Sequence, residues 1–199
     1  MLTRYKKFMK HAKKVAVDFG GTRPILTGIN HFTNGDLAAT NSHVLYYAEG
    51  LHDKKLDEDT VYSPTGVLIE GKYPNIGRLL PAVDPQFRAT LGVEEFTEAM
   101  EQVQLPGKIY KDAATVMDFR GNKLTSEVNE ISVTYSLQVG IPEEYSFSSN
   151  PLYWLFAMKM FKDFGYKEVK FNFYGSMRPF TLVSPDNKIQ VLILPVRRY

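Results

Sequence analysis

The residues best suited to chemistry are basic side chains near the start of the chain. Residues 1–30 contain seven basic residues against one acidic residue, Asp18. Clustered lysine and arginine side chains bind phosphate groups without reading base sequence, because binding releases counterions condensed on nucleic acid. A solvated helix face is the competing explanation, and charge alone favours it. The candidate DNA-binding residues are Arg4, Lys6, Lys7, Lys10, Lys13 and Lys14.

Other reactive combinations of side chains are missing from the sequence. There is no cysteine, which excludes disulfides, a thiol nucleophile and cysteine-ligated metals. The four histidines are not spaced as ligands on one helix or strand face, so we expect no metal site. No nucleophile, base and orienting residue stand out together. We therefore expect that the protein is not an enzyme and binds no cofactor. The alternative is an enzyme that uses a fold better known for another role, and it would require a cleft lined by clustered ionisable residues.

Length and composition are those of a folded globular protein. The chain has 199 residues, of which 44% are hydrophobic and 23% are charged, enough for one large or two small domains. The net charge of +2 does not by itself predict nucleic acid binding. Apolar runs are far shorter than the ~20 residues of a membrane span, and the first residues lack the apolar core of a secretory signal. We expect a cytoplasmic protein that does not enter membranes.

Hydrophobic spacing divides the first part of the chain into a helix and several strands. Apolar residues recur every three or four positions over residues 3–16, which predicts an amphipathic helix capped by Thr3, with Gly20-Gly21 ending the segment. The pair Asn34-Gly35 predicts a hairpin turn. We expect strands over residues 23–33 and 36–48, a bent or edge strand over 61–69, an irregular segment over 73–81 and a linker over 83–85.

The second part of the chain shows the same kinds of element. A helix is expected over residues 93–104, ended by Pro106-Gly107, and another over residues 151–164, with Asn150 as its cap and a proline at its first position. Strands are expected over residues 113–119, 123–139, 167–174, 177–184 and 189–196, and the run over 123–139 is expected to be broken by a turn or bulge. The similar order of elements in residues 86–140 and 150–199 indicates an internal structural repeat.

This order of elements predicts an α+β fold in which helices lie on one face of antiparallel sheets. We expect two domains, over residues 1–82 and 83–199. A fragment of about 80 residues is marginally stable alone, so the first domain is expected to pack on its neighbour or on a partner subunit.

Four sequence segments together resemble the bacterial DNA sliding clamp family, the beta subunit of DNA polymerase III. They are RPILTG at residues 23–28, ATNSHVL at 39–45, GKYP with RLLP at 71–81, and GSMRPF at 175–180 followed by LPVR at 194–197. The resemblance implies the DNA clamp fold, with antiparallel sheets outside and helices on one face. It implies a shortened middle-type clamp domain over residues 1–82 and a complete C-terminal-type domain over 83–199, without the family's N-terminal domain.

The resemblance implies a sliding clamp-like processivity factor in DNA replication that has no covalent chemistry of its own. Its implied partners are duplex DNA, bound without sequence preference, DNA polymerase and other clamp-binding peptides. The family's ring has six domains, so a two-domain chain is expected to form a homo-oligomer, with a trimer favoured over a dimer or an open assembly. The alternative is a clamp-like interaction protein that captures clamp-binding peptides, or pairs with a full clamp, without encircling DNA.

The resemblance also implies a peptide-binding pocket between the middle and last domains, with an apolar anchor site inside a polar rim. Two residues depart from the family's pattern: Ser42 replaces a glycine and Val44 replaces an arginine. Each leucine taken singly is also a natural core residue. The implied lining is Leu26, Thr40, Ser42, His43, Val44, Leu45, Pro74, Arg78, Leu79, Asn150, Tyr153, Met177, Leu192, Leu194, Pro195, Val196 and Arg197.

The helix expected over residues 93–104 conflicts with a ring lined by basic helices. It contains four glutamates and no basic residue. Three explanations are open: the acids turn away from DNA, the helix docks on a basic surface such as residues 3–16 of another subunit, or the protein does not encircle DNA. The four residues are Glu94, Glu95, Glu98 and Glu101.

Overall fold

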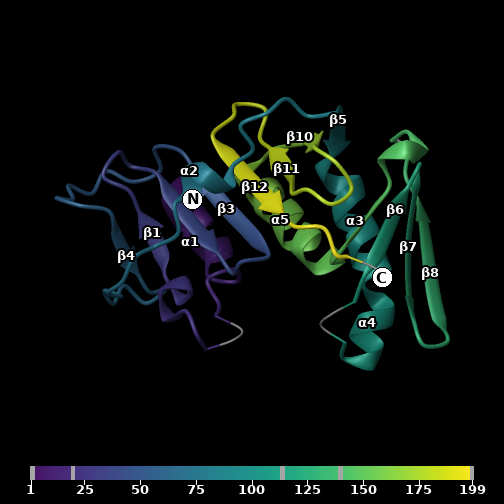
Figure 1. Cartoon of the computed structure of the whole chain (residues 1–199), viewed down its shortest axis with the longest axis horizontal. Helices are drawn as coiled ribbons and strands as arrows, with labels where there is room; N and C mark the ends of the chain where they lie inside the picture. The colour runs from purple at the N-terminus through teal and green to yellow at the C-terminus, as the bar shows by residue number, and fades with distance from the viewer. Residues whose placement is uncertain (1–2, 19–20, 113–114, 139–140, 198–199) are drawn as a thin grey trace. The chain divides into compact units, whose positions relative to one another are not determined.

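The computed structural model describes residues 3–18, 21–112, 115–138 and 141–197, which form two compact units (Figure 1). Unit 1 comprises residues 1–82 and 183–192, and unit 2 comprises residues 83–182 and 193–199. Residues 183–192 therefore pack with unit 1, although they follow most of unit 2 in sequence. The architecture is the expected α+β class, with antiparallel sheets and helices.

Unit 1 is an antiparallel sheet with a helix packed on one face. Its strand order is β4-β1-β2-β3-β12. The helix α1 contributes the buried side chains Phe8 and Ala12 to the core. The elements are α1 Arg4–Ala12, the 3-10 turn η1 Pro24–Thr27, β1 Ile29–His31, β2 Leu37–Thr40, β3 Val44–Ala48, β4 Thr60–Tyr62, α2 Ile76–Leu79 and, through residues 189–192, β12 Ile189–Ile193.

The helix α1 begins where the sequence predicts and ends earlier. The Thr3 hydroxyl oxygen accepts the N–H of Lys6 at 3.3 Å, so the predicted cap is confirmed. The helix ends at Ala12 rather than at residue 16. Val15 and Ala16 are nevertheless buried, because the chain turns their side chains into the core after the helix has ended. The helical spacing of apolar residues therefore extends beyond the end of the helix, so the predicted helix was longer than the one observed. Gly20 lies outside the described residues.

The strand predicted over residues 23–33 is wrong in its first half. Pro24 begins a 3-10 turn there, because its ring fixes φ and its nitrogen has no hydrogen to donate to a sheet. The strand β1 begins only at Ile29. The Asn34-Gly35 turn that follows is confirmed, and Gly35 has the positive φ of 93° that favours glycine.

Residues 36–48 form two strands and a tight turn rather than one strand. The Asn41 side-chain oxygen accepts the N–H groups of His43 and Val44 at 3.0 and 2.9 Å, which reverses the chain between β2 and β3. The bent strand expected over residues 61–69 is present as β4, which pairs with β1 and bridges back to Leu68. The segment expected to be irregular contains the short helix α2, capped by Asn75.

Unit 2 contains a complete four-stranded sheet and a second group of strands. The orders are β8-β7-β6-β9 and β11-β10-β5. Its elements are β5 Phe87–Gly92, α3 Val93–Val103, α4 Leu105–Tyr110, β6 Met117–Arg120, β7 Lys123–Val128, β8 Ile131–Ser136, the 3-10 turn η2 Glu143–Tyr145, β9 Phe147–Ser149, α5 Pro151–Phe164, β10 Glu168–Phe173 and β11 Phe180–Val183.

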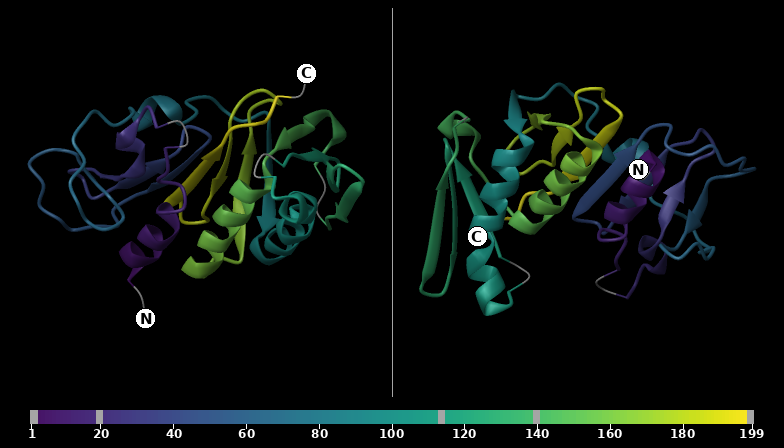
Figure 2. Two further views of the ribbon diagram at one scale, coloured as in Figure 1. Left: turned by 90° about the horizontal axis from the view of Figure 1, so that it is seen from below. Right: turned by 180° about the vertical axis from the view of Figure 1, so that it is seen from behind.

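The order of elements repeats, as the sequence indicates. One strand, a helix and three strands follow one another in β5 to β8 and again in β9 to β12, with α4 added after the first helix. The opening strands are exchanged between repeats, because β5 pairs with β10 and β9 pairs with β6. The helices α3 and α5 pack against each other in unit 2 (Figure 2).

An aromatic cluster forms the core of unit 2. The Trp154 ring stacks on Phe96 and Phe147, and its indole nitrogen donates to the Ser149 hydroxyl at 3.1 Å. The Trp154 side chain has no exposed surface, so it is a core residue. Because aromatic side chains bury large apolar areas, this cluster fixes α3 and α5 against the strands beneath them.

The boundaries in unit 2 are partly those expected. Helix α5 and its Asn150 cap are confirmed. Helix α3 is also confirmed, but Pro106 starts α4 instead of ending the helical region, because proline is compatible with the first turn of a helix. The break expected within residues 123–139 is confirmed, because a turn at Asn129, which has φ 52°, separates β7 from β8. Residues 113, 114 and 139 lie outside the described part of the chain.

The last two strands are shorter than expected. The strand expected from Met177 begins only at Phe180, after a turn in which Arg178 N–H donates to the Gly175 carbonyl. The strand expected to reach residue 196 ends at Ile193, two residues before Pro195. Proline has no backbone N–H to donate to a sheet ladder, which agrees with a strand that ends before Pro195.

Candidate functional site

Helical periodicity separates α1 into a buried face and a basic face. Five of the six predicted DNA-binding residues are exposed, and Lys7 is half-buried. Positions four and three residues apart share one side of a helix, so Lys6, Lys10 and the C-cap residue Lys13 lie opposite buried Phe8 and Ala12. This arrangement directs at least three positive charges away from the sheet.

Polar contacts hold α1 on its sheet. The Tyr5 hydroxyl and the His31 Nε2 atom are 3.0 Å apart, and the two rings lie 5.9 Å apart. At the start of the helix, the Arg4 guanidinium lies 3.4 Å from the Asp186 carboxylate, and both side chains are about half exposed. The basic face is therefore positioned by a partly buried aromatic contact and by a weaker surface ion pair.

His31 is the buried residue through which α1 contacts β1. It has no exposed surface, and its Nδ1 atom lies 3.0 Å from the Ile29 carbonyl oxygen. Burial lowers the pKa of His31 from 6.5 to about 4, the Ile29 carbonyl opposes this shift, and Lys54 and His52 add to it. A neutral His31 fits this site, since Tyr5 donates to one ring nitrogen while the other donates to the carbonyl.

Two acidic residues of α3 pair with lysines of α5. The Glu101 carboxylate lies 2.6 Å from the Lys159 ammonium, and Glu94 lies 3.2 Å from Lys162. The hydrogen bond from Lys159 and its charge lower the pKa of Glu101. Two of the four glutamates of α3 are thus neutralised by lysines of the same unit. The sequence pattern did not indicate these ion pairs.

The other two glutamates lie toward β8. Glu95 accepts the backbone N–H of Gln138 at 2.6 Å. Glu98 is exposed, and it raises the pKa of Tyr135 on β8 together with Glu95, after the larger effect of desolvation. The outer side of α3 is therefore acidic and repels phosphate, unlike that of α1.

The residues implied for peptide binding in unit 1 gather around the turn between β2 and β3. Thr40 donates its hydroxyl to the Val44 carbonyl at 2.8 Å and accepts the Ser42 N–H at 3.2 Å. Ser42 has φ 74°, in the left-handed region that favours glycine, so a serine at this position holds a strained backbone conformation. Ser42 and His43 are exposed at the tip of this turn.

Tyr73 connects this turn to the following implied segment, and the sequence analysis missed it. Its hydroxyl accepts the Thr40 N–H at 3.1 Å and lies 3.4 Å from the Ala38 carbonyl. Burial raises the pKa of Tyr73, so the phenol stays protonated. The only signal for this role was its place beside Pro74 in the family-like GKYP segment.

Exposure divides the implied residues of unit 1 into two groups. Leu79 is 44% exposed, Arg78 is exposed and Pro74 is half-buried, and they flank or lie in α2. Five others have at most 6% of their surface exposed and belong to the core of the unit. These are Leu26, Thr40, Val44, Leu45 and Leu192.

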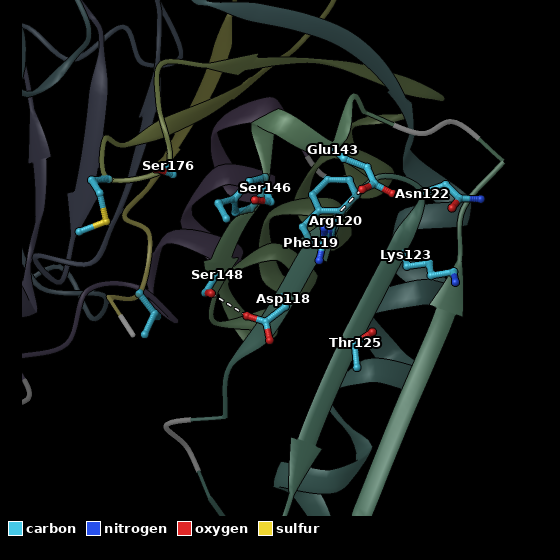
Figure 3. A pocket seen from close by; sticks show the side chains of 13 residues that line it. Asp118, Phe119, Arg120, Asn122, Lys123, Thr125, Glu143, Ser146, Ser148 and Ser176 are labelled. Atoms are coloured by element: carbon cyan, nitrogen blue, oxygen red, sulfur yellow. Dashed lines mark hydrogen bonds and ion pairs between the residues drawn. The ribbon is translucent and has the colours of Figure 1, made fainter. Parts of the chain in front are cut away.

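Unit 2 brings two implied peptide-binding residues, Met177 and Val196, into one open hollow of about 780 Å³ (Figure 3). Met177 is 55% exposed. Val196 N–H donates to the Ser148 carbonyl at 2.8 Å, which ties the C-terminal segment to β9. The same hollow is lined by an ion pair of Arg120 with Glu143 at 3.5 Å that sequence reasoning did not single out.

The remaining implied residues of unit 2 do not all join this hollow. Asn150 caps α5 by accepting the Leu152 N–H at 2.9 Å, and both line a different hollow of about 300 Å³ beside α4. Half-buried Tyr153 lies on the first turn of α5. Leu194 and Pro195 are half-buried and Arg197 is exposed along the C-terminal segment.

The described residues offer no group of three or more metal-ligating side chains. His31 and His52 do lie close, with ring centroids 5.1 Å apart, a contact between distant residues that spacing did not reveal. No helix within the described ranges has the length and apolar character needed to span a membrane.

Comparison with known proteins identifies relatives of one kind. The sequence is 28% identical over 231 aligned residues to the beta sliding clamp of Bacillus subtilis strain 168, covering 92% of this chain and 60% of that protein. It is 26% identical to the beta sliding clamp of Streptococcus pneumoniae serotype 4, over 65% of this chain and 35% of that one. No family model matches the sequence.

Solved structures agree over almost the whole chain. The beta chain of DNA polymerase III from Streptococcus pneumoniae matches with a TM-score of 0.79 at 23% identity, covering 99% of this chain and 64% of that one. The Bacillus subtilis sliding clamp matches with a TM-score of 0.79 at 23% identity, over 98% and 62%. The chain has the fold of the bacterial beta sliding clamps. It spans about three fifths of the length of the clamps it resembles.

The clamp fold explains why α1, α3 and α5 are arranged in the same way. Each is an amphipathic helix laid on antiparallel strands, and each leaves one side for solvent or a ligand. In this clamp-like chain the exposed sides differ in charge, so the fold alone does not decide which helix can approach DNA.

Proposed function

We propose that this protein is a sliding clamp-type processivity factor in DNA replication, which tethers a polymerase to duplex DNA. The observation that carries the proposal is the match to the beta clamp fold over 99% of the chain. A clamp acts by topology and by binding, which agrees with the expectation of a protein without covalent chemistry. The protein is expected to act in the cytoplasm, where bacterial replication takes place.

The DNA contact in this proposal is the basic face of α1. Lys6, Lys10 and Lys13 are exposed opposite the buried side of the helix and carry no sequence information. Arg4, Lys7 and Lys14 add positive charge beside them. Such contacts attract the phosphate backbone of any duplex and let it slide, which is what a processivity factor needs.

The partner contact in this proposal is the implied set of peptide-binding residues. A Helicobacter pylori beta clamp with a TM-score of 0.71 to this chain, at 18% identity and covering 96% of this chain and 62% of that one, was solved bound to a DNA ligase peptide. In unit 1 we assign the exposed turn and α2 residues to peptide contact, with buried neighbours supporting them. In unit 2 we assign Asn150, Tyr153, Met177, Leu194, Pro195, Val196 and Arg197.

The assembly in this proposal is a homotrimer of the chain. A ring of six clamp-type domains requires three copies of a two-domain chain. Light scattering after gel filtration would then give three times the 22.7 kDa mass of one chain.

Retention on circular DNA tests the function as a whole. The protein is loaded on a closed circular duplex, washed at high salt, and the circle is then cut. A topological clamp stays on the circle and leaves when the DNA is linear, because salt weakens phosphate contacts but cannot open a ring. Equal loss from both forms of DNA would contradict encirclement.

Peptide binding provides a separate test. A labelled clamp-binding peptide is titrated against the wild type and against Leu194→Asp, where a charge enters the implied apolar site. We expect at least a tenfold loss of affinity, because burying a carboxylate without a partner is costly. Val83→Asp is the control, since Val83 is 57% exposed. Unchanged binding by Leu194→Asp would contradict the assigned residues.

A further inference from the structure

The hollow of unit 2 that contains Met177 and Val196 extends well beyond these two residues (Figure 3). Its volume of about 780 Å³ lies within the range of roughly 300–1,000 Å³ that is typical of ligand sites, so it has room for several side chains of a bound peptide. Most of its lining comes from β6 and β7 beside the turn that joins them, from η2 and from β9. The proposed function assigns no role to that part of the hollow.

The register of β6 and β7 places four polar side chains on the face that lines the hollow. Arg120 is directly opposite Lys123, and Asp118 is directly opposite Thr125. Directly opposite residues of antiparallel strands share a face, and so do residues two positions apart along one strand. Phe119 alternates with these residues and is buried among the rings of the core. The floor of the hollow is therefore polar and carries two adjacent cations.

Arg120 and Lys123 together lack one negative charge. The Cβ atoms of directly opposite residues are about 4.5–5.5 Å apart, and like charges at this spacing destabilise a sheet. Arg120 pairs with Glu143 at 3.5 Å. Lys123 is exposed, and no ion pair or hydrogen bond engages its side chain within the ranges that the structure describes. A second carboxylate would complete the neutralisation of the two cations.

The ion pair of Arg120 with Glu143 leaves room for that carboxylate. The two side chains are 74% and 72% exposed, and pairs at such exposure are weak and easily exchanged. A guanidinium group has five N–H donors in a planar fork, so it can serve two carboxylates at once. An acidic group brought by a partner can therefore lie between Lys123 and Arg120 without expelling Glu143.

The rest of the lining favours a single acidic side chain over nucleic acid. Asp118 accepts the hydroxyl of Ser148 at 2.6 Å, and Glu143 lies beside Arg120 (Figure 3). These two carboxylates repel a polyanion such as DNA, because each phosphate brings a further negative charge. One carboxylate on a peptide needs only the two cations, so the charges of the hollow complement an acidic peptide.

The apolar border of the same hollow provides the second contact for such a peptide. Met177 is 55% exposed, and the segment that contains Val196 is fixed to the Ser148 carbonyl. Both residues belong to the proposed peptide contact. A peptide whose apolar side chain packs on Met177 thus extends its neighbouring residues over the polar floor, at about 3.3–3.6 Å per residue.

We propose that this hollow selects partner peptides in which an acidic residue lies beside the apolar residues that contact Met177, and that Lys123 and Arg120 bind the carboxylate. The inference rests on the proposed function, because it names the chemistry of the peptides that a clamp of this kind binds. Lys123 is in this view a residue that determines specificity, while the apolar contacts hold every peptide.

Extended peptides test the preference for an acidic residue. The DNA ligase peptide is prepared with three glutamates, three glutamines or three lysines added at either end, and its affinity is measured by fluorescence anisotropy. For one of the two ends, the glutamate form should bind about fivefold tighter than the glutamine form, and the lysine form should bind more weakly. Equal affinities of the glutamate and glutamine forms at both ends would overturn the proposal.

Reversing the charge of Lys123 should reverse the preference. Lys123→Glu is expected to bind the lysine form better than the glutamate form. Lys167→Glu is the matched control, because Lys167 is exposed, lies outside the lining and changes the net charge equally. This control should keep the wild-type preference for glutamate. The same preference in both variants would overturn the proposal, since net charge would then account for the effect.

Removal of Glu143 should strengthen binding, a gain that a misfolded variant cannot give. Glu143→Gln releases Arg120, so the glutamate form of the peptide should bind about two- to threefold tighter than it binds the wild type. Glu144→Gln removes an exposed charge one position away, outside the lining, and should give less gain. Unchanged or weaker binding by Glu143→Gln would overturn the role of Arg120.

The unextended DNA ligase peptide separates this inference from the proposed function. The wild type and Lys123→Glu should bind it equally, because it carries no added acidic residues. Binding of this peptide without any preference among the extended forms would overturn the inference and leave the peptide-binding part of the proposed function standing. No binding of any peptide by the wild type would instead contradict that part of the proposed function.

Discussion

The helices α1 and α3 have similar lengths, but their outer faces carry charges of opposite sign. Both bury an apolar side against strands, but α1 directs Lys6 and Lys10 outward, where α3 directs Glu94 and Glu98 outward. If the protein binds duplex DNA as proposed, electrostatics favours contact with the first helix and opposes contact with the second. The clamp fold therefore supplies the scaffold, while a few outward positions decide whether a given helix can face DNA.

Their neighbours differ as well. In unit 2, α5 lies beside α3 and supplies Lys159 and Lys162 to two of its glutamates. Within the described residues of unit 1, no second helix of comparable length accompanies α1. Positive charge thus accumulates on α1, whereas negative charge on α3 is partly neutralised by its own unit. The comparison predicts that DNA affinity depends on unit 1.

The largest expected effect comes from reversing the basic face of α1. The triple variant Lys6→Glu, Lys10→Glu, Lys13→Glu should weaken duplex binding at least about 100-fold and lower the salt dependence of binding by about three phosphate contacts. Fluorescence anisotropy with a short duplex at several salt concentrations measures both quantities.

A charge-matched control separates position from net charge. Lys55, Lys72 and Lys167 are exposed outside α1, and replacing all three with glutamate changes the charge equally. We expect a much smaller loss, due to the weakened long-range field alone. Equal losses for the two triple variants would show that α1 has no special role.

Acid should loosen unit 1 through His31. Its pKa is about 4 in the folded protein and about 6.5 when unfolded, so the unfolded state binds more protons between these values. The stabilisation is complete above pH 6.5 and is lost as the pH falls toward 4, by about 2 kcal/mol at pH 5. Urea unfolding at pH 7 and pH 5 measures the loss.

Other groups also titrate in this range, so the change with pH must be compared between variants. His31→Gln removes the titrating ring, whereas His43→Gln removes an exposed histidine of the β2–β3 turn. We expect the loss between pH 7 and pH 5 to shrink in His31→Gln and to persist in His43→Gln. The same pH dependence in both variants would exclude His31 as its source.

Placing positive charge on α3 should create a second DNA-binding helix. Glu98 and Gln102 are exposed on its outward side, and replacing both with lysine should raise duplex affinity about tenfold at low salt. Glu98→Gln, which only removes a charge, should give less than half of the change in binding free energy. No gain in the lysine variant would indicate that the helices of unit 2 do not approach DNA.

The smallest effect concerns the strained turn of unit 1. Ser42→Gly should stabilise the protein by about 0.5–1 kcal/mol, because glycine adopts positive φ without steric cost. Ser42→Ala keeps the strain and should give no gain. Thermal unfolding of the two variants makes the comparison, and equal stability would show that the turn is not strained.

The candidate site was only partly readable in the sequence. The basic face of α1 followed from spacing, because a single helix supplies all of its residues. The implied peptide-binding residues came from family-like segments, and Tyr73 was missed because its hydrogen bonds reach residues more than thirty positions away. Likewise, the pairing of Glu101 with Lys159 joins two helices and has no local signature.

The sequence by itself determined the class of fold, the helix that starts at the Asn150 cap, the hairpin turn at Asn34-Gly35 and the uneven distribution of charge. These features depend on neighbouring residues and on helix or strand periodicity, which are local properties of the chain. Only the tertiary structure decided where α1 ends, which glutamates meet lysines, and that β7 is the one strand that pairs with β8 among the described residues. Those outcomes depend on contacts between distant residues, and such contacts exist only once the chain has folded.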